Sequence, residues 1–184
     1  MAIIVCGAKR TGTSLMMQTL KILGVDVPAP AFYPEKDVLH ESYIDCNPNG
    51  LYEHTPSNKA DLTKYIDKMS AFKFIGPEII TLPNGLVSHL IICNRNRENS
   101  VNSHIRVGEK IYGGPISNKQ AMLHYNETYE CIDCLLKVYN GNVLRVFYEN
   151  MVVYPEGQVE RIIRFLGIDD SNRQLAINNV KRII

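Results

Sequence analysis

The sequence predicts a single α/β domain in which a parallel β-sheet is flanked by helices on both faces. Short apolar runs typical of buried strands alternate along the chain with longer segments of helical composition, which is the pattern of a parallel sheet. The length of 184 residues suits one domain with a substantial core. A hydrophobic content of 45% and a charged content of 21% are ordinary for a globular protein. We therefore expect residues 1–184 to form one domain.

The first part of the chain is expected to fold as a strand, a helix and an irregular segment. Residues 2–6 form a short apolar run that predicts a buried strand, and residues 12–24 have helical composition and end at a glycine. Residues 25–43 are rich in proline and aromatic residues, which favours an irregular excursion. A further helix is expected over residues 56–69.

The later elements continue the alternation of strands and helices. Strands are expected over residues 71–76, 89–94 and 142–148, and helices over residues 97–106, 120–139 and 155–166. The last of these helices begins with a proline and is followed by Gly167, a typical stop signal. Residues 109–119 contain Gly113-Gly114-Pro115 and are expected to form a surface loop.

The turn after the first strand has the composition of a phosphate-binding loop. The strand ends at Gly7, and Gly12 precedes the next helix, so backbone N–H groups and the positive end of the helix dipole face an anion there. In nucleotide triphosphatases a lysine after the second glycine reaches the phosphates. Here that position is Thr13, and the basic residues are Lys9 and Arg10. The loop therefore suits a phosphate better than a magnesium-bound triphosphate; an ordinary tight glycine turn is the alternative.

A second anion site is predicted beyond the strand at residues 89–94. Ligands of open α/β sheets collect beyond the carboxyl ends of the strands, where Arg95 lies. Ser103 lies on the following helix, so a guanidinium and a hydroxyl can converge on one anion. The alternative is a surface arginine with an exposed helical serine.

Charge, apolar runs and cysteines narrow the function classes. A formal net charge of +1 argues against a general nucleic-acid binder. Apolar stretches such as residues 86–93 are too short to span a bilayer, and the chain starts directly in a strand, so neither membrane insertion nor secretion is expected. The five cysteines are scattered and describe no disulfide framework, which favours a cytoplasmic protein.

Four segments, taken in order, resemble the sulfotransferase family. Residues 9–15 are similar to its loop of the form P-K/R-S-G-T-T/S-L, and Arg95 and Ser103 have the spacing of its arginine and serine for a 3′-phosphate. Residues 146–167 resemble its late R-Y-E-D-L…P…F-L-G stretch. Residues 47–53 are similar to an N-P-x-G-x-x-E stretch of bacterial members. The resemblance covers most of the chain.

The resemblance implies a P-loop-like three-layer sandwich that transfers a sulfuryl group from 3′-phosphoadenosine 5′-phosphosulfate (PAPS) to an acceptor hydroxyl or amine. The product of the donor would be 3′,5′-adenosine bisphosphate (PAP), no metal would be needed, and the acceptor would be a small molecule or glycan. Arg95 and Ser103 would hold the 3′-phosphate. Arg10 would also stabilise the leaving oxygen. The residues implied at the 5′-phosphate are Gly7, Lys9, Arg10, Thr11, Gly12, Thr13 and Ser14.

Transfer to a hydroxyl also needs a general base. The family keeps its base in the segment after the first helix, and Glu53 is the first candidate there because it lies in the family-like stretch. His54 is the second candidate, followed by His40 and Glu41. For each of these side chains a solvated or capping role is the alternative.

Two other function classes remain open at the level of sequence. A nucleotide or small-molecule kinase with a degenerate loop would depend on ATP and Mg²⁺, and Thr13 in place of lysine argues against it. A catalytically idle nucleotide-binding protein of the same fold is the other alternative. Arg97, which replaces a proline common in the family, keeps this second alternative open.

Overall fold

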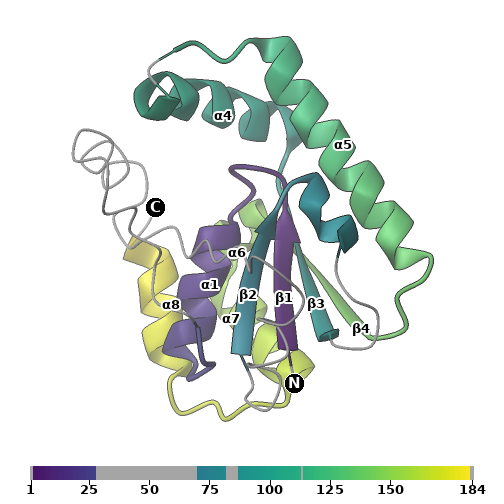
Figure 1. Ribbon diagram of the computed structural model, residues 1–184. Coiled ribbons are helices and arrows are strands. Elements are labelled where there is room, and N and C mark those ends of the chain that lie inside the picture. The colour runs from purple at the N-terminus through teal and green to yellow at the C-terminus, as the bar shows by residue number, and fades with distance from the viewer. Residues whose placement is uncertain (1, 28–69, 82–86, 113, 183–184) are drawn as a thin grey trace, which may run out of the picture.

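The computed structural model describes residues 2–27, 70–81, 87–112 and 114–182 (Figure 1). In chain order the elements are β1 (Ala2–Gly7), α1 (Thr13–Ile22), β2 (Ser70–Ile75), the 3-10 helix η1 (Pro77–Thr81), β3 (Val87–Asn94), α4 (Arg97–Tyr112), α5 (Asn118–Leu136), β4 (Asn142–Phe147), α6 (Tyr148–Val153), α7 (Pro155–Leu166) and α8 (Arg173–Arg182).

The four described strands form one parallel sheet in the order β2-β1-β3-β4. Strand β1 lies in the middle, where Ile4 pairs with Phe72 of β2 on one side and with Leu90 of β3 on the other. Every residue of β1 is buried, as expected for a strand covered on both faces. Strand β4 is an edge, and its residues alternate between exposed and buried over most of its length.

Two hydrophobic clusters lie on the two faces of the sheet. Odd-numbered residues of β1, such as Ile3 and Val5, pack with side chains from α1, α6, α7 and α8. Even-numbered residues, such as Ile4, pack instead with Ile79 of η1 and with Ile132 of α5. This period of two follows from the pleat of a strand, which points successive side chains to opposite faces. The predicted three-layer arrangement is therefore confirmed.

The ends of the helices follow from local chemistry. Helix α5 begins with a capping box in which Ser117 accepts a hydrogen bond from the backbone of Gln120, whose side chain accepts one from the Ser117 backbone. Helix α7 starts with Pro155 and ends at Gly167, which adopts the left-handed conformation, as its sequence predicts.

The helices depart from the predictions in three places. Tyr148 was expected at the end of a strand but is the first residue of α6, a helix that the sequence did not predict. Helix α4 continues to Tyr112, so residues 109–112 of the predicted loop are helical, because the first strong breaking signal comes only with the two glycines and proline that follow. Helix α8 has no counterpart in the predictions; Ala176, Ile177 and Val180 on it are buried against the α1 face of the sheet. The predicted helix at 56–69 lies outside the described residues.

The fold brings two loops to the carboxyl edge of the sheet. The turn from β1 to α1 leaves this edge next to the turn from β3 to α4, since β1 and β3 are paired neighbours. Helices α4 and α5 extend beyond the same edge, and the β1–α1 turn reaches up toward α4 (Figure 1). In the part of the chain that the structure describes, no helix has the length and apolar character needed to cross a membrane.

Candidate functional site

The β1–α1 loop is held in a conformation that few sequences can adopt. Arg10 has φ 67° and Gly12 has φ 92°, so both lie in the left-handed region, which is uncommon for a residue with a Cβ. Gly7 has no room for a side chain, because a Cβ there would lie 2.6 Å from the carbonyl oxygen of Cys93. The Thr11 hydroxyl donates to the carbonyl of Ala8 at 2.7 Å and closes the loop from inside.

The amino terminus of α1 has no side-chain cap. Gly12 occupies the N-cap position, so no side-chain cap bonds the first N–H groups, and the first turn contains no acidic residue. Uncapped N–H groups and the positive end of the helix dipole together favour an anion. The loop therefore has the backbone geometry that its sequence predicts for phosphate binding.

Helix α4 packs directly on this loop. The Nε of Arg10 donates to the Oγ of Ser103 at 3.2 Å. The Nη1 of Arg95 donates to the carbonyl of Arg10 at 3.1 Å, and the Ser100 hydroxyl donates to the carbonyl of Lys9 at 2.9 Å. The two segments that the sequence suggests separately, around Arg10 and around Arg95, thus form one contiguous basic site.

Arg95 is fixed by further contacts on several sides. Its guanidinium carbon lies 4.4 Å from the centre of the Tyr148 ring, within cation–π range. Its backbone carbonyl accepts a hydrogen bond from the Tyr125 hydroxyl at 3.0 Å. The Nε of Arg95 is buried and has no hydrogen-bond partner among the residues that the structure describes. A buried guanidinium N–H without a partner is costly, so this group suits an anionic ligand.

Lys73 is a basic residue of this site that the sequence analysis missed. It lies on β2 and is only 3% exposed, and its Nζ donates to the Ser14 hydroxyl at 3.2 Å at the start of α1. The sequence carries a signal for it: a lysine stands between Phe72 and Phe74 in an otherwise apolar strand. Because alternate residues of a strand share a face, Lys73 points to the α1 side, as Ala71 does.

The other predicted site residues are distributed as follows. Thr13 is the first residue of α1 and is buried, and Thr11 is buried with its hydroxyl inside the loop. The predicted bases Glu53 and His54, the alternatives His40 and Glu41, and the family-like stretch at 47–53 lie outside the described residues. Among the residues that the structure describes, no group of three or more His, Cys, Asp or Glu side chains could hold a metal ion.

Two histidines pack against each other between α4 and α5. The rings of His104 and His124 meet edge to face with centres 5.4 Å apart. Burial, followed by the charge of Lys9, by His124 and by Arg10, lowers the pKa of His104 to about 4. Burial and Lys9 also lower the pKa of His124. Both rings are therefore neutral near pH 7, and the positive charge there comes from the loop.

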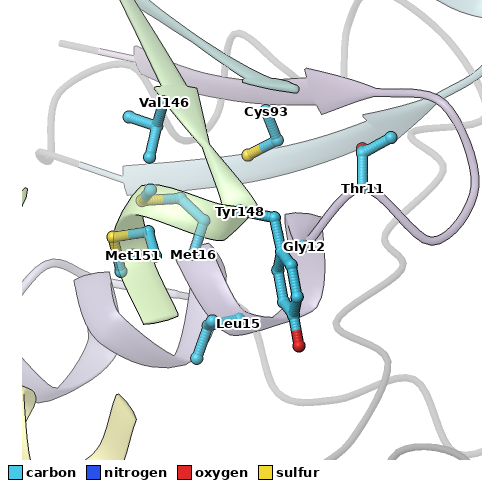
Figure 2. A pocket seen from close by; sticks show the side chains of 8 residues that line it. All are labelled: Thr11, Gly12, Leu15, Met16, Cys93, Val146, Tyr148 and Met151. Atoms are coloured by element: carbon cyan, nitrogen blue, oxygen red, sulfur yellow. The ribbon is translucent and has the colours of Figure 1, made fainter. Parts of the chain in front are cut away.

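A small cavity lies behind the loop. It occupies about 10 Å³ between α1, β3, β4 and α6, enough for about one water molecule. Figure 2 shows Thr11, Gly12 and Tyr148 at one side of it, and Met16 and Met151 at the other. It is far too small for a nucleotide.

A comparison with known sequences identifies the family of this chain. The sequence profile of the sulfotransferase family matches residues 81–172, half of the chain, and this segment contains Arg95, Ser103 and Tyr148. The chain belongs to the sulfotransferase family. A search of curated proteins finds no match to this sulfotransferase-family chain.

Solved structures support the same fold. Retinol dehydratase in complex with androsterone and inactive cofactor PAP is 15% identical, with a TM-score of 0.55 over 98% of this chain and 64% of its own. Retinol dehydratase with retinol and PAP is 18% identical, with a TM-score of 0.55 over 99% of this chain and 63% of its own.

The sulfotransferase domain of the Synechococcus PCC 7002 olefin synthase is 16% identical, with a TM-score of 0.55 over 94% of this chain and 74% of its own. This family member thus spans less than two thirds of the length of retinol dehydratase. At these identities the likenesses show a shared fold.

Proposed function

We propose that this protein transfers a sulfuryl group from PAPS to the hydroxyl or amine of a small molecule or glycan. Membership of the sulfotransferase family supports the reaction, and PAP is present in the retinol dehydratase complexes of similar fold. The observation that carries the proposal is the direct contact of Arg95 and Ser103 with the phosphate loop. A nucleotide with phosphates at both its 5′ and 3′ positions is the ligand that such a joined site fits best.

The residues divide between the two phosphates of the nucleotide. Backbone N–H groups of the loop and of the start of α1 would bind the 5′-phosphate, with Lys73 and Ser14 beside it. Ser103 and the buried N–H of Arg95 would bind the 3′-phosphate. The uncapped start of α1 and this orphaned N–H are features of the chain itself that fit two anionic groups.

The chemistry calls for fixed positive charge at the bond that breaks. The donor supplies a sulfuryl group on a phosphate, and negative charge grows on the bridging oxygen during transfer. Arg10 is proposed to stabilise this oxygen, and the ammonium of Lys73 adds a second positive charge near the same helix end. Both side chains are already positioned by contacts, which limits reorganisation during the reaction.

A general base is proposed from the segment after the first helix. Glu53 is the first candidate and His54 the second, with His40 and Glu41 as alternatives. Changing Glu53 to Gln should leave nucleotide binding intact while lowering turnover by roughly a hundredfold to ten-thousandfold. Retained turnover in Glu53→Gln together with a loss in His54→Ala would move the base by one residue. We further propose that the protein acts in the cytoplasm, as its scattered cysteines suggest.

The donor class can be tested without knowing the acceptor. PAP should raise the melting temperature in the absence of metal, and AMP should raise it much less, because AMP lacks the 3′-phosphate. A ligand at a hundred times its dissociation constant stabilises the folded state by roughly 2.7 kcal/mol. Equal effects of PAP and AMP would contradict a 3′-phosphate site. A larger effect of ATP with Mg²⁺ would favour the kinase alternative.

A further inference from the structure

A pair of histidines adjoins the proposed donor site where α4 and α5 pack together. His104 of α4 directly follows Ser103, and its ring meets the ring of His124 of α5 edge to face, with the two centres 5.4 Å apart. We propose that His104, His124 and Lys9 form a subsite for an oxyanion, and that the acceptor carries a carboxylate or sulfate group that binds there. This inference rests on the function proposed above and names the class of its acceptor.

Each ring of the pair has a buried nitrogen without a partner. These atoms are Nε2 of His104 and Nδ1 of His124, which form no hydrogen bond with the residues that the structure describes. His104 is only 7% exposed. A neutral imidazole carries its proton on either nitrogen, so each of these atoms can be a donor. Because an unpaired buried donor is costly, a ligand oxygen that accepts from the rings is favoured.

His89 shows that burial alone does not leave a histidine of this chain unpaired. It is about as buried as His104, at 8% exposed, and it lies near the start of β3, at the opposite edge of the sheet from the loop. Its Nδ1 forms a hydrogen bond with Oγ of Ser88 at 2.9 Å, and its Nε2 forms one with Nδ2 of Asn142 at 3.4 Å. Among the histidines that the structure describes, the unpaired buried nitrogens thus belong to the pair near the loop.

The charge around the pair favours an anion over a metal ion. Burial is the largest cause that lowers the pKa of both rings, and the charge of Lys9 is the next. His124 and Arg10 lower the pKa of His104 further. The electrostatic potential at the two rings is therefore positive. It attracts an anion and repels a metal ion, although neutral imidazoles are common metal ligands.

The subsite adjoins the elements that supply the charges for transfer, which suits an acceptor. Lys9 directly precedes Arg10, the residue proposed to stabilise the leaving oxygen. A Cβ at Gly76 would lie 3.2 Å from Nε2 of His124, so this ring lies against the turn that follows β2. Lys73 is on β2, three residues before that turn. A molecule whose anionic group binds at the pair therefore has its remaining part near the bond that breaks.

The test follows the histidine ring resonances by NMR in protein saturated with PAP, so that added anions do not occupy the donor site. Sodium acetate and sodium sulfate are titrated separately at pH 7, with chloride keeping the ionic strength constant. We expect saturable shifts of His104 and His124 with at least one of the two anions and no shift of His89, the internal reference. Acetamide has the shape of acetate without its charge and should shift none of them. A response to acetate alone indicates a carboxylated acceptor, and a response to sulfate alone a sulfated one.

Variants then locate the binding. His104→Phe and His124→Phe keep a ring and remove its nitrogens, so each should weaken anion binding about ten- to hundredfold, the range of a charge-assisted hydrogen bond, with PAP affinity unchanged. His89→Phe is the matched control and should change neither affinity. The bound anion should also raise the pKa of His104 above about 4, since an anion favours the protonated ring.

Several outcomes would overturn the inference. They are the absence of shifts at both rings, equal shifts of His89 or with acetamide, and unchanged anion affinity in both phenylalanine variants of the pair. Should these variants fail to fold, the titration of the wild type with His89 as reference decides alone. Failure of PAP to bind would reject the proposed function instead, and the same titration of the free protein would still test the subsite.

Discussion

The two segments of the proposed donor site are built in different ways. The β1–α1 loop takes its shape from backbone conformation, with Arg10 and Gly12 at positive φ and Gly7 too close to Cys93 for a side chain. The β3–α4 segment uses ordinary backbone and places side chains instead, chiefly Arg95 and Ser103. Backbone N–H groups bind any phosphate, so we expect the first segment to give affinity and the second to choose the nucleotide.

The largest effect is expected from a side chain placed in the backbone-built segment. Gly12→Ala puts a Cβ 2.8 Å from the Tyr148 ring at φ 92°. Strain and overpacking together should lower the free energy of unfolding by about 3 kcal/mol, measured by denaturant titration. Gly157→Ala is the control, because Gly157 lies in α7 with open space around it; alanine there should stabilise slightly. Equal stability of the two variants would mean that the loop is not constrained.

Arg95→Ala tests the β3–α4 segment, which we expect to select the nucleotide. Loss of a charge-assisted hydrogen bond is worth about 1.5–3 kcal/mol, so PAP affinity should fall roughly ten- to hundredfold more than AMP affinity. Arg106→Ala removes the same group from an exposed position on α4, the helix that follows Arg95, and should leave the ratio unchanged. Equal losses for both nucleotides would show that Arg95 only supports the loop.

Lys73→Met tests whether the β1–α1 loop binds nucleotides equally well with and without a 3′-phosphate. The ammonium reaches Ser14 at the start of α1, so both PAP and AMP should lose about tenfold in affinity. Methionine fills the space of this buried lysine, so folding should be preserved. A loss confined to PAP, measured by calorimetry, would place Lys73 with Arg95 instead of with the loop.

The histidine behind the loop gives the fold a pH dependence. His104 has a pKa of about 4 in the folded protein, against about 6.5 when unfolded, so the unfolded chain takes up the proton first as the pH falls. Stability should therefore drop between pH 7 and pH 5, by up to about 2 kcal/mol for this group. His104→Asn should flatten that slope in melts recorded across the range. An unchanged slope would assign it to other groups, His124 among them.

Ser103→Ala is expected to have the smallest effect. It removes a neutral hydroxyl that accepts from Arg10, and a hydrogen bond of this kind contributes about 1 kcal/mol. PAP affinity should fall about fivefold and AMP affinity less, by calorimetry. A loss larger than that of Arg95→Ala would mean that Ser103, and not Arg95, is the main contact of the β3–α4 segment with the 3′-phosphate.

The elements that depend on local sequence signals could be predicted from the sequence. The apolar runs and the glycines predict β1, the loop and α1 within about two residues, because strand, turn and helix signals follow one another there. The spacing of Arg95 and Ser103 predicts one anion site through family resemblance, and the residues lie together against the loop. Their assignment to a nucleotide stays a prediction, as does Glu53, which lies outside the described residues.

Contacts between distant segments could not be predicted in the same way. Lys73 and Tyr148 reach the loop only because β2 pairs with β1 and because α6 follows β4. The residues around Lys73 and Tyr148 do not by themselves predict either arrangement. The extent of α4 was missed for a related reason: Gly108 weakens a helix in isolation, but it lies within α4 as a buried residue. Burial in the folded protein offsets a weak local preference.

The central place of β1 has a consequence for how the chain reaches this fold. Ile4 is synthesised well before its partners Phe72 and Leu90. We therefore expect β1 to remain an unpaired apolar segment during synthesis until β2 has emerged, and refolding to be slowed by the closure of these long loops. Until that moment the buried centre of the mature sheet is the part of the nascent chain most exposed to aggregation.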